Sequence, residues 1–156
     1  MSSPFDDDRL TAAGLFLEAH DGLMDHISRV HRQHGLNSRD FDAMLRIARS
    51  TDRCLRMSDL ATQTGTSTSG ITRVVDRLES NDYVERSLAP DDRRSWLVTL
   101  TEAGATALAD DIADLVLVID EVLLDPLGGS ASAFFDKVRM IRDHVRPQAT
   151  VVTSND

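Results

Sequence analysis

The sequence predicts a mainly α-helical fold with one small β-hairpin, and three observations carry this prediction. Apolar residues recur every three or four positions along most of the chain, which is the period of an amphipathic helix. Strict alternation occurs in one short stretch, 95–100, which closely follows a second β-prone stretch, 83–87. Glycine, proline or a hydroxyl residue marks most segment ends. With 156 residues, the chain is long enough for one compact domain or for two lobes that share a core.

Two helices are predicted in the first third of the chain. The first covers 10–34, with Gly35 as its C-terminal stop, and the nine residues before it are expected to be loose. Asn37 or Ser38 offers an N-cap for the second helix, which ends near residue 50.

Two further helices follow in close succession. Ser58 opens a short one, and Gly65 closes it. Ser67 caps the next, 68–80, in which apolar residues at i, i+3, i+4 and i+7 form one stripe, namely Ile71, Val74, Val75 and Leu78.

The hairpin and two more helices complete a predicted set of six helices. The loop 88–94 joins the two strands. Thr101 caps a fifth helix that runs to Pro126, and Ser130 starts a last helix that stops before Pro147. The polar tail, 147–156, is expected to be flexible.

Composition argues against several classes of protein. No apolar run approaches the roughly 20 residues of a membrane span, and the N-terminus has no signal-like apolar segment, so we expect a cytoplasmic protein without a membrane partner. The single cysteine, Cys54, excludes an internal disulfide. The net charge of -9 is unfavourable for a nucleic-acid binder. However, 16 of the 17 basic residues are arginine, and residues 53–101 hold seven arginines against seven acids.

The third and fourth predicted helices, joined by residues 65–67, form the pattern of a helix-turn-helix. A helix that enters the major groove needs small hydroxyl residues near its start and an arginine that reaches base edges. Ser67, Thr68, Ser69, Thr72 and Arg73 meet that need. The alternative is a merely solvated helix face.

A hairpin directly after such a helix is typical of the wing of a winged helix-turn-helix. Its tip carries Arg93 and Arg94, which we interpret as minor-groove contacts, with Asp92 as the partner that orients Arg94. The alternative is a surface turn whose charges neutralise one another.

The stretches "SDLATQTGTSTSGITRVVDRLESNDYVER" and "DRRSWLVTLTEAG" resemble the helix-turn-helix and the wing of MarR-type transcriptional regulators. The resemblance covers roughly residues 10–146. It implies a homodimer, a pseudo-palindromic double-stranded DNA operator and a repressor that a small ligand releases from DNA. It also implies dimerisation helices at 10–36 and 101–146 and a DNA-binding lobe at 38–100, with flexible tails at 1–9 and 147–156.

Three positions depart from the family pattern. Asp82 stands where glycine is frequent. Aspartate can adopt the left-handed conformation expected there, but less readily than glycine does. Ser87 stands where a second wing arginine is common, so fewer phosphate contacts are expected from that strand. Arg86, Arg93 and Arg94 are the wing arginines that remain for such contacts. Trp96 replaces a polar or basic residue and is expected to anchor the wing against the body.

These observations together give a predicted set of DNA-binding residues: Ser67, Thr68, Ser69, Thr72, Arg73, Arg77, Arg86, Asp92, Arg93 and Arg94. A dimer also answers the charge objection, because it gathers the locally neutral segments on one face. The acids of the fifth helix would then point elsewhere, namely Asp110, Asp111, Asp114, Asp120 and Glu121.

Other functions find little support. No catalytic constellation, phosphate loop or cofactor motif is present, so an enzyme and a bound cofactor are not expected. Of the histidines at 20, 26, 31 and 34, only His31 and His34 have an i, i+3 spacing, and a metal site would need further ligands from elsewhere. Helix-surface or pocket histidines are therefore favoured over a zinc-sensing site, and no metal is expected. A small anionic or aromatic effector is the ligand class we expect. His20 or His34 could hydrogen-bond such an anion, but a lone helical histidine is more often satisfied by its neighbours. The rival hypothesis is a protein-binding scaffold, which the net charge favours and the arginine pair disfavours.

Overall fold

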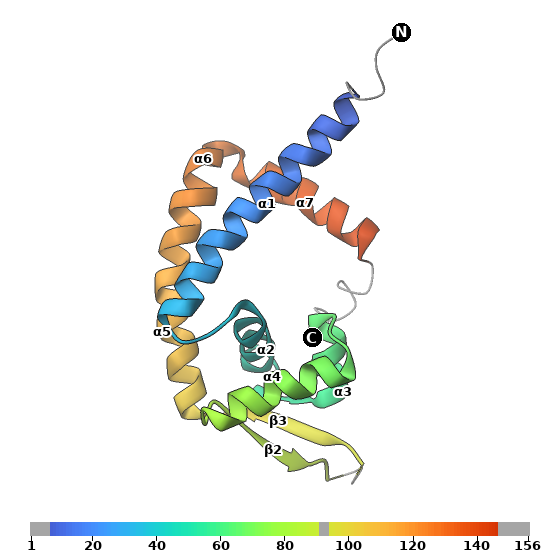
Figure 1. Ribbon diagram of the computed structural model, residues 1–156, viewed down its shortest axis with the longest axis vertical. Helices are drawn as coiled ribbons and strands as arrows, with labels where there is room; N and C mark the ends of the chain where they lie inside the picture. Colours follow the sequence, from blue (N-terminus) through green and yellow to red (C-terminus); the bar gives the residue numbers. More distant parts are fainter. Residues whose placement is uncertain (1–6, 91–93, 147–156) are drawn as a thin grey trace.

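The computed structural model describes residues 7–90 and 94–146 (Figure 1). Its α-helices are α1 (Asp8–Gln33), α2 (Ser38–Ala48), α3 (Met57–Thr64), α4 (Thr68–Ser80), α5 (Glu102–Ile119), α6 (Asp125–Leu127) and α7 (Ala131–Val145). Its strands are β1 (Cys54–Arg56), β2 (Val84–Leu88) and β3 (Trp96–Leu100). The predicted mainly α-helical fold with a β-hairpin is confirmed.

The elements gather into two lobes that α5 connects (Figure 1). Helices α2, α3 and α4 lie with the strands at one end, which we call the sheet lobe. The N-terminal half of α1, together with α6 and α7, lies at the other end, which we call the outer lobe. Helix α5 starts beside the hairpin and runs into the outer lobe, and the C-terminal part of α1 packs along it.

The predicted capping residues act as expected. Asn37 accepts hydrogen bonds from the backbone N–H groups of Arg39 and Asp40 at the start of α2. The Ser67 hydroxyl accepts from Gly70 N at 3.2 Å, and that of Thr101 accepts from Gly104 N at 2.9 Å. Each cap satisfies an N–H group that has no partner within its helix.

Three predictions about helix limits are wrong. Helix α1 begins at Asp8, two residues early, because Asp7 caps it by accepting from Arg9 N at 2.9 Å. Ser58 does not open α3, which begins at Met57 without a side-chain cap. The predicted fifth helix divides into α5, a π-helical segment (Asp120–Leu124) and α6, and a short 3-10 turn (Gly128–Ser130) follows.

The predicted number of six helices is therefore not the number found. The π-helical segment lies directly before Pro126, the second residue of α6. Proline has no N–H group for the regular helical ladder, and a wider turn accommodates that loss.

A third strand joins the predicted hairpin. Strand β1 pairs antiparallel with β3, so the sheet order is β1-β3-β2, and Cys54 lies opposite Thr99. The sequence did not reveal β1, because three residues are too few to show alternation.

The core of the sheet lobe lies where α2, α4, the hairpin and α5 meet. Helix α4 buries the predicted stripe, with Ile71 at 1% exposed and Val75 and Leu78 fully buried. These side chains contact a shared cluster that includes Met44 of α2 and Val98 of β3. The inner side of α4 is thereby fixed, and its opposite side faces outward.

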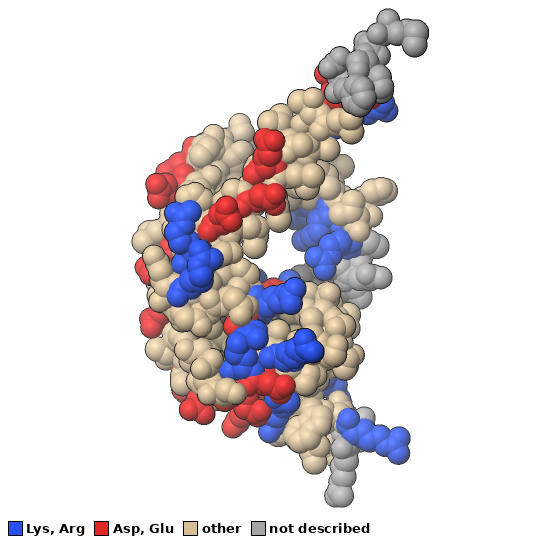
Figure 2. Space-filling view, viewed as in Figure 1, with Lys and Arg blue, Asp and Glu red and all other residues tan. Residues whose placement is uncertain are grey.

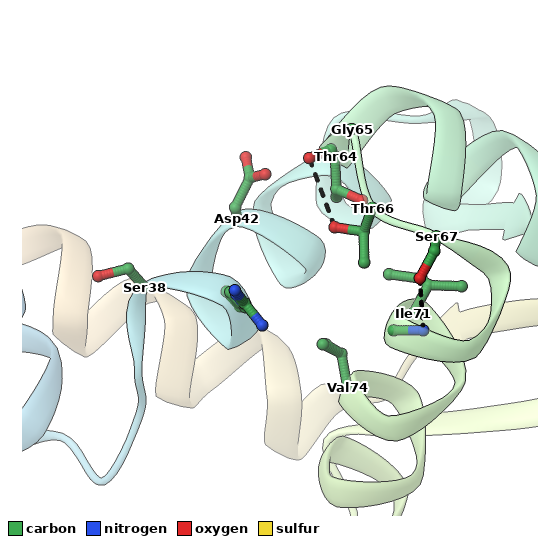
Figure 3. Close-up of a pocket in the computed structure, with 10 residues that line it drawn as sticks. Ser38, Asp42, Thr64, Gly65, Thr66, Ser67, Ile71 and Val74 are labelled. Carbon is green, nitrogen blue, oxygen red and sulfur yellow. Dashed lines mark hydrogen bonds between the residues drawn. The ribbon is translucent and has the colours of Figure 1, made fainter.

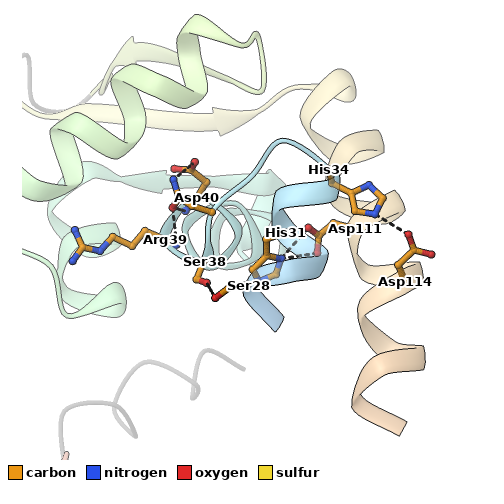
Figure 4. A network of polar contacts seen from close by, with 9 residues as sticks. Ser28, His31, His34, Ser38, Arg39, Asp40, Asp111 and Asp114 are labelled. Atoms are coloured by element: carbon orange, nitrogen blue, oxygen red, sulfur yellow. Dashed lines mark hydrogen bonds and ion pairs between the residues drawn. The ribbon is translucent and has the colours of Figure 1, made fainter. Parts of the chain in front are cut away.

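A buried polar pair joins α1 to α5. Nδ1 of His31 lies 2.9 Å from Oδ2 of Asp111, and the two residues are 1% and 0% exposed (Figure 4). The His31 ring also stacks on Phe41 of α2, with the ring centroids 4.4 Å apart. The prediction that Asp111 is a surface acid is wrong, because this contact takes its carboxylate into the interior.

Gly104, the last residue of the wing motif, sits where α5 meets the backbone before β2. A Cβ added there would lie 2.1 Å from the carbonyl oxygen of Tyr83 and 2.9 Å from Cδ1 of Leu100. Neither backbone nor core can withdraw far enough to accept a methyl group, so the motif requires glycine for a steric reason.

We expect Gly104→Ala to lower the free energy of unfolding by about 1–3 kcal/mol, because the overlap with Tyr83 outweighs the gain in helix propensity. Urea denaturation followed by circular dichroism measures it. Gly22→Ala is the matched control, because a Cβ at Gly22 meets nothing within 4 Å. That change should stabilise α1 by about 0.5–1 kcal/mol. Equal stabilisation by both substitutions would contradict the steric explanation.

Candidate nucleic-acid interface

The outward side of α4 carries the small hydroxyl residues that the sequence singled out. Ser67, Thr68 and Ser69 are exposed, and Thr72 is half-buried with its hydroxyl donating to the Thr68 carbonyl at 2.8 Å. Arg73 is exposed, and it makes no hydrogen bond or ion pair with any residue that the structure describes. The first two turns of α4 therefore present short side chains and one long cationic one.

Arg77 lies one turn further along α4, and although its side chain is 44% exposed, its guanidinium is bound to a buried acid of α2. Its Nε donates to both carboxylate oxygens of Asp40, at 3.0 and 2.9 Å, and its NH2 group donates to Oδ1. The hydrogen bonds to Asp40 raise the pKa of Arg77, and burial opposes that shift. Arg77, which the sequence predicted as a DNA contact, is thus paired with an acid of the sheet lobe itself.

Arg86 of β2 is also engaged internally. Its NH2 group pairs with Asp76 and, at 3.1 Å, with Glu79, both on α4. Its Nε is buried without a hydrogen-bond partner among the described residues. The base of the hairpin is therefore tied to the second half of α4.

The hairpin extends beyond the core. Arg94 is exposed just before β3, whereas Asp92 and Arg93 lie outside the described residues. Asp82, where the family often has glycine, has φ 59, which confirms the expected left-handed conformation.

The expectation that Trp96 anchors the wing against the body is wrong. Trp96 is 47% exposed and pairs across the hairpin with Leu88, itself 49% exposed. Both side chains lie on the sheet face that carries the buried Val98, but past the edge of the core. The indole is accessible.

Charges of opposite sign occupy different parts of the molecule, although not completely. In Figure 2, acidic side chains follow α1 and the outer edge of α5, and basic side chains lie over the sheet lobe, over α7 and in one group where α1 crosses α5. Acids remain beside them, including Asp76 and Glu79 on α4.

A cavity of about 460 Å³ opens between the start of α2, the turn before α4 and the inner side of α4 (Figure 3). Its apolar wall is Ile71 and Val74, and Arg39 and Asp42 supply charges. Three hydroxyl residues line the turn, namely Thr64, Thr66 and Ser67. Polar groups thus converge on an apolar wall, as in small-molecule sites.

Sequence reasoning missed this cavity and both ion-pair networks of α4. One signal was present: Asp40 precedes Met44 and Ile47 by four and seven residues, so a carboxylate stands on the apolar stripe of α2. A charge in such a position requires a partner from another element.

Two expected absences can be described in structural terms. Within residues 7–90 and 94–146, no three His, Cys, Asp or Glu side chains are grouped so that they could hold a metal ion. No helix in the same part of the chain is both long and apolar enough to cross a membrane.

Comparisons with known proteins agree with this geometry. A model of the MarR family matches residues 34–95. The HTH-type transcriptional regulator MhqR of Bacillus subtilis is 30% identical over 105 residues, which are 67% of this chain and 71% of MhqR. Two crystal structures from Streptomyces coelicolor share the fold. AbsC, a MarR family regulator, has a TM-score of 0.84 and 26% identity and covers 94% of this chain and 99% of its own.

The second crystal structure, Sco3205 in complex with DNA, has a TM-score of 0.81 and 23% identity and covers 94% of this chain and 92% of its own. The matched helix-turn-helix, the identity to MhqR and the shared fold lead to one conclusion. The chain belongs to the MarR family of transcriptional regulators.

Proposed function

We propose that the protein is a homodimeric, ligand-responsive repressor that binds a pseudo-palindromic operator. Helix α4 of each subunit enters the major groove, and the wing arginines Arg93 and Arg94 reach the minor groove. The observation that carries the proposal is the outward side of α4, where Arg73 stands unpaired among the described residues beside small hydroxyl side chains. Such a surface suits contact with base edges. A protein that binds operator DNA must share a compartment with the chromosome, so we include a cytoplasmic location in this proposal.

A second copy of the chain accounts for the apolar surface of the outer lobe. Exposed large side chains occur on two helices of this lobe and on the part of α5 that enters it: Leu10, Leu15 and Leu17 on α1, Leu117 on α5, and Met140 and Val145 on α7, each 60–66% exposed. Apolar exposure on this scale supports pairing through 10–36 and 101–146, which leaves 38–100 as the DNA-binding lobe. A twofold dimer would set the two α4 helices about one helical turn of DNA apart.

The acidic composition is compatible with this function because the charges are unevenly spread. Acids along α1 and α5 lie away from the outward side of α4 (Figure 2). We expect roughly 6–10 phosphates to be neutralised per dimer, which makes binding strongly dependent on salt.

The cavity beside α4 is the candidate site for an effector. Arg39 and the hydroxyl of Ser67 suit a carboxylate, and the wall of Ile71 and Val74 suits an apolar or aromatic body. This chemistry fits a small organic anion. No protein cofactor is part of the proposal.

Titration with duplex DNA from the protein's own upstream intergenic region tests the function. Trp96 is the single tryptophan and is half-exposed on the wing, so we expect its fluorescence to change on binding. Affinity should fall by about 10³–10⁵ between 50 and 200 mM salt if roughly 6–10 phosphates are contacted. Binding no tighter than to an unrelated duplex would exclude an operator there, and no binding to any duplex would favour the protein-binding scaffold.

Arg73→Ala should relax sequence preference. We expect a loss of about 1–3 kcal/mol at one base pair per half-site, because a bidentate arginine contact discriminates by that amount. Competition with operators that carry single base-pair changes measures it. Arg29→Ala, which removes an exposed arginine of α1, is the control. Equal weakening on every sequence would mean that Arg73 contacts only phosphate.

Arg94→Ala should weaken operator binding without changing the subunit association. The loss of a backbone or minor-groove cation lowers the slope of log affinity against log salt by about 1 per wing. Fluorescence titration at several salt concentrations gives the slope, and analytical ultracentrifugation gives the oligomeric state. An unchanged operator affinity would remove Arg94 from the interface.

A further inference from the structure

Arg77 and Asp40 form the most buried ion pair on α4, and they are 37 residues apart in the sequence. The Asp40 side chain is 4% exposed and that of Arg77 is 44% exposed. Nε of Arg77 lies 3.0 Å from Oδ1 and 2.9 Å from Oδ2, and NH2 also donates to Oδ1. This forked contact has a fixed plane, which a single-point ammonium contact would not have.

Asp40 is itself held in place by the start of α2. Nδ2 of Asn37 donates to its Oδ2 at 2.7 Å, while Oδ1 of Asn37 accepts from the Asp40 N–H at 3.1 Å. The adjacent Ser38 hydroxyl lies 3.3 Å from that of Ser28 on α1 (Figure 4). Arg77 therefore binds a carboxylate whose orientation Asn37 fixes by a hydrogen bond. That carboxylate belongs to α2, which is joined to α1 through Ser38 and Ser28.

Release of Arg77 toward a phosphate would leave this buried carboxylate without a cationic partner. An uncompensated buried charge costs more than an exposed ion pair returns, so the pair should persist when DNA binds. Arg77 consequently differs from Arg73, which forms no ion pair with any residue that the structure describes.

A forked contact at one position of α4 opposes rotation of the helix about its axis. Apolar burial is not directional, so the stripe fixes how closely α4 packs but defines its rotation less sharply. A rotation of about 10° moves a side chain at a radius of roughly 6 Å by about 1 Å. Recognition geometry tolerates only about 0.5 Å. Arg73 is one helical turn before Arg77, so the anchor acts close to the residue that reads the base.

On the other side of α4, Arg86 of β2 holds Asp76 and Glu79. The helix is thus fixed to the wing on one side and to α2 on the other. Only the Asp40 contact is buried at its acidic end, because Asp76 and Glu79 are 56% and 44% exposed.

We propose that Asp40 and Arg77 are positioning residues for operator recognition: they hold α4 at the rotation that base reading requires, and neither contacts DNA. The inference rests on the proposed function, because it concerns how α4 reads an operator.

Four variants test it: Arg77→Lys, Arg77→Gln, Asp40→Asn and the double variant Asp40→Asn/Arg77→Gln. Binding to the operator and to an unrelated duplex is measured over a range of salt concentrations. The temperature is kept below that at which circular dichroism shows the onset of unfolding of any variant. Arg77→Lys keeps the charge and leaves Asp40 a cationic partner, so it should fold. Arg46→Gln is the matched control, because it removes an ion pair with Asp42 within α2 itself, in which the two side chains are 36% and 38% exposed.

We expect each single variant to lose roughly tenfold or more in operator affinity, as a displacement of about 1 Å does at a precise site. Binding to the unrelated duplex and the salt slope should not change. The double variant should bind no more weakly than the single ones, because both changes remove the same contact. The control should bind like the wild type.

Two results would overturn the positioning role. If Arg77 contacts phosphate, Arg77→Lys binds nearly normally, Arg77→Gln weakens every duplex equally with a smaller salt slope, and Asp40→Asn binds as well as the wild type or better. If the pair serves stability alone, every folded variant keeps full operator affinity. A wild type that binds no operator would instead overturn the proposed function, and this inference with it.

Discussion

The packing of α4 against the other elements of the sheet lobe is the constraint on which the rest of the structure depends. Ile71, Val75 and Leu78 are at most 1% exposed, and each buried side chain of this size contributes about 1.5–3 kcal/mol. Once these positions face inward, the helical period directs the opposite side outward. The surface that carries Arg73 is thus a geometric consequence of the burial of its neighbours on the same helix.

Ion pairs add the direction that apolar packing lacks. Arg77 binds the buried carboxylate of Asp40, and Arg86 binds two acids of α4 from the adjacent strand. The arginines of the sheet lobe therefore have two different roles. Arg77 and Arg86 bind acids of neighbouring elements, whereas Arg73 is the arginine that we propose contacts DNA. A count of charges does not distinguish these roles, which explains why a net charge of -9 is a poor guide to the function of this chain.

The sheet lobe is also firmly joined to the long helices. His31 and Asp111 connect α1 to α5 in a buried contact, and the stack of His31 on Phe41 extends that contact to α2. Separation of α1 from α5 would leave buried polar groups without partners, which costs free energy. The start of α2, where Asp40 lies, therefore belongs to the same packed unit as the helices through which we propose that two subunits pair. Such a unit would keep the spacing of two recognition helices constant.

The sequence by itself determined the features that depend on neighbours within a few residues. The helical periods, the caps at Asn37, Ser67 and Thr101, the left-handed Gly65 and Asp82, and the hairpin all follow from local geometry. The hydroxyl-rich start of α4 was visible for the same reason.

Tertiary structure alone decided the rest. The pairing of β1 with β3, the burial of Asp111, the exposure of Trp96 and the partners of Arg77 and Arg86 depend on residues that are distant in the sequence. An arginine on a helix face is compatible with a phosphate contact or with an internal acid. For Arg77 the choice follows from the burial of the Asp40 carboxylate, which would lose its cationic partner if Arg77 turned outward.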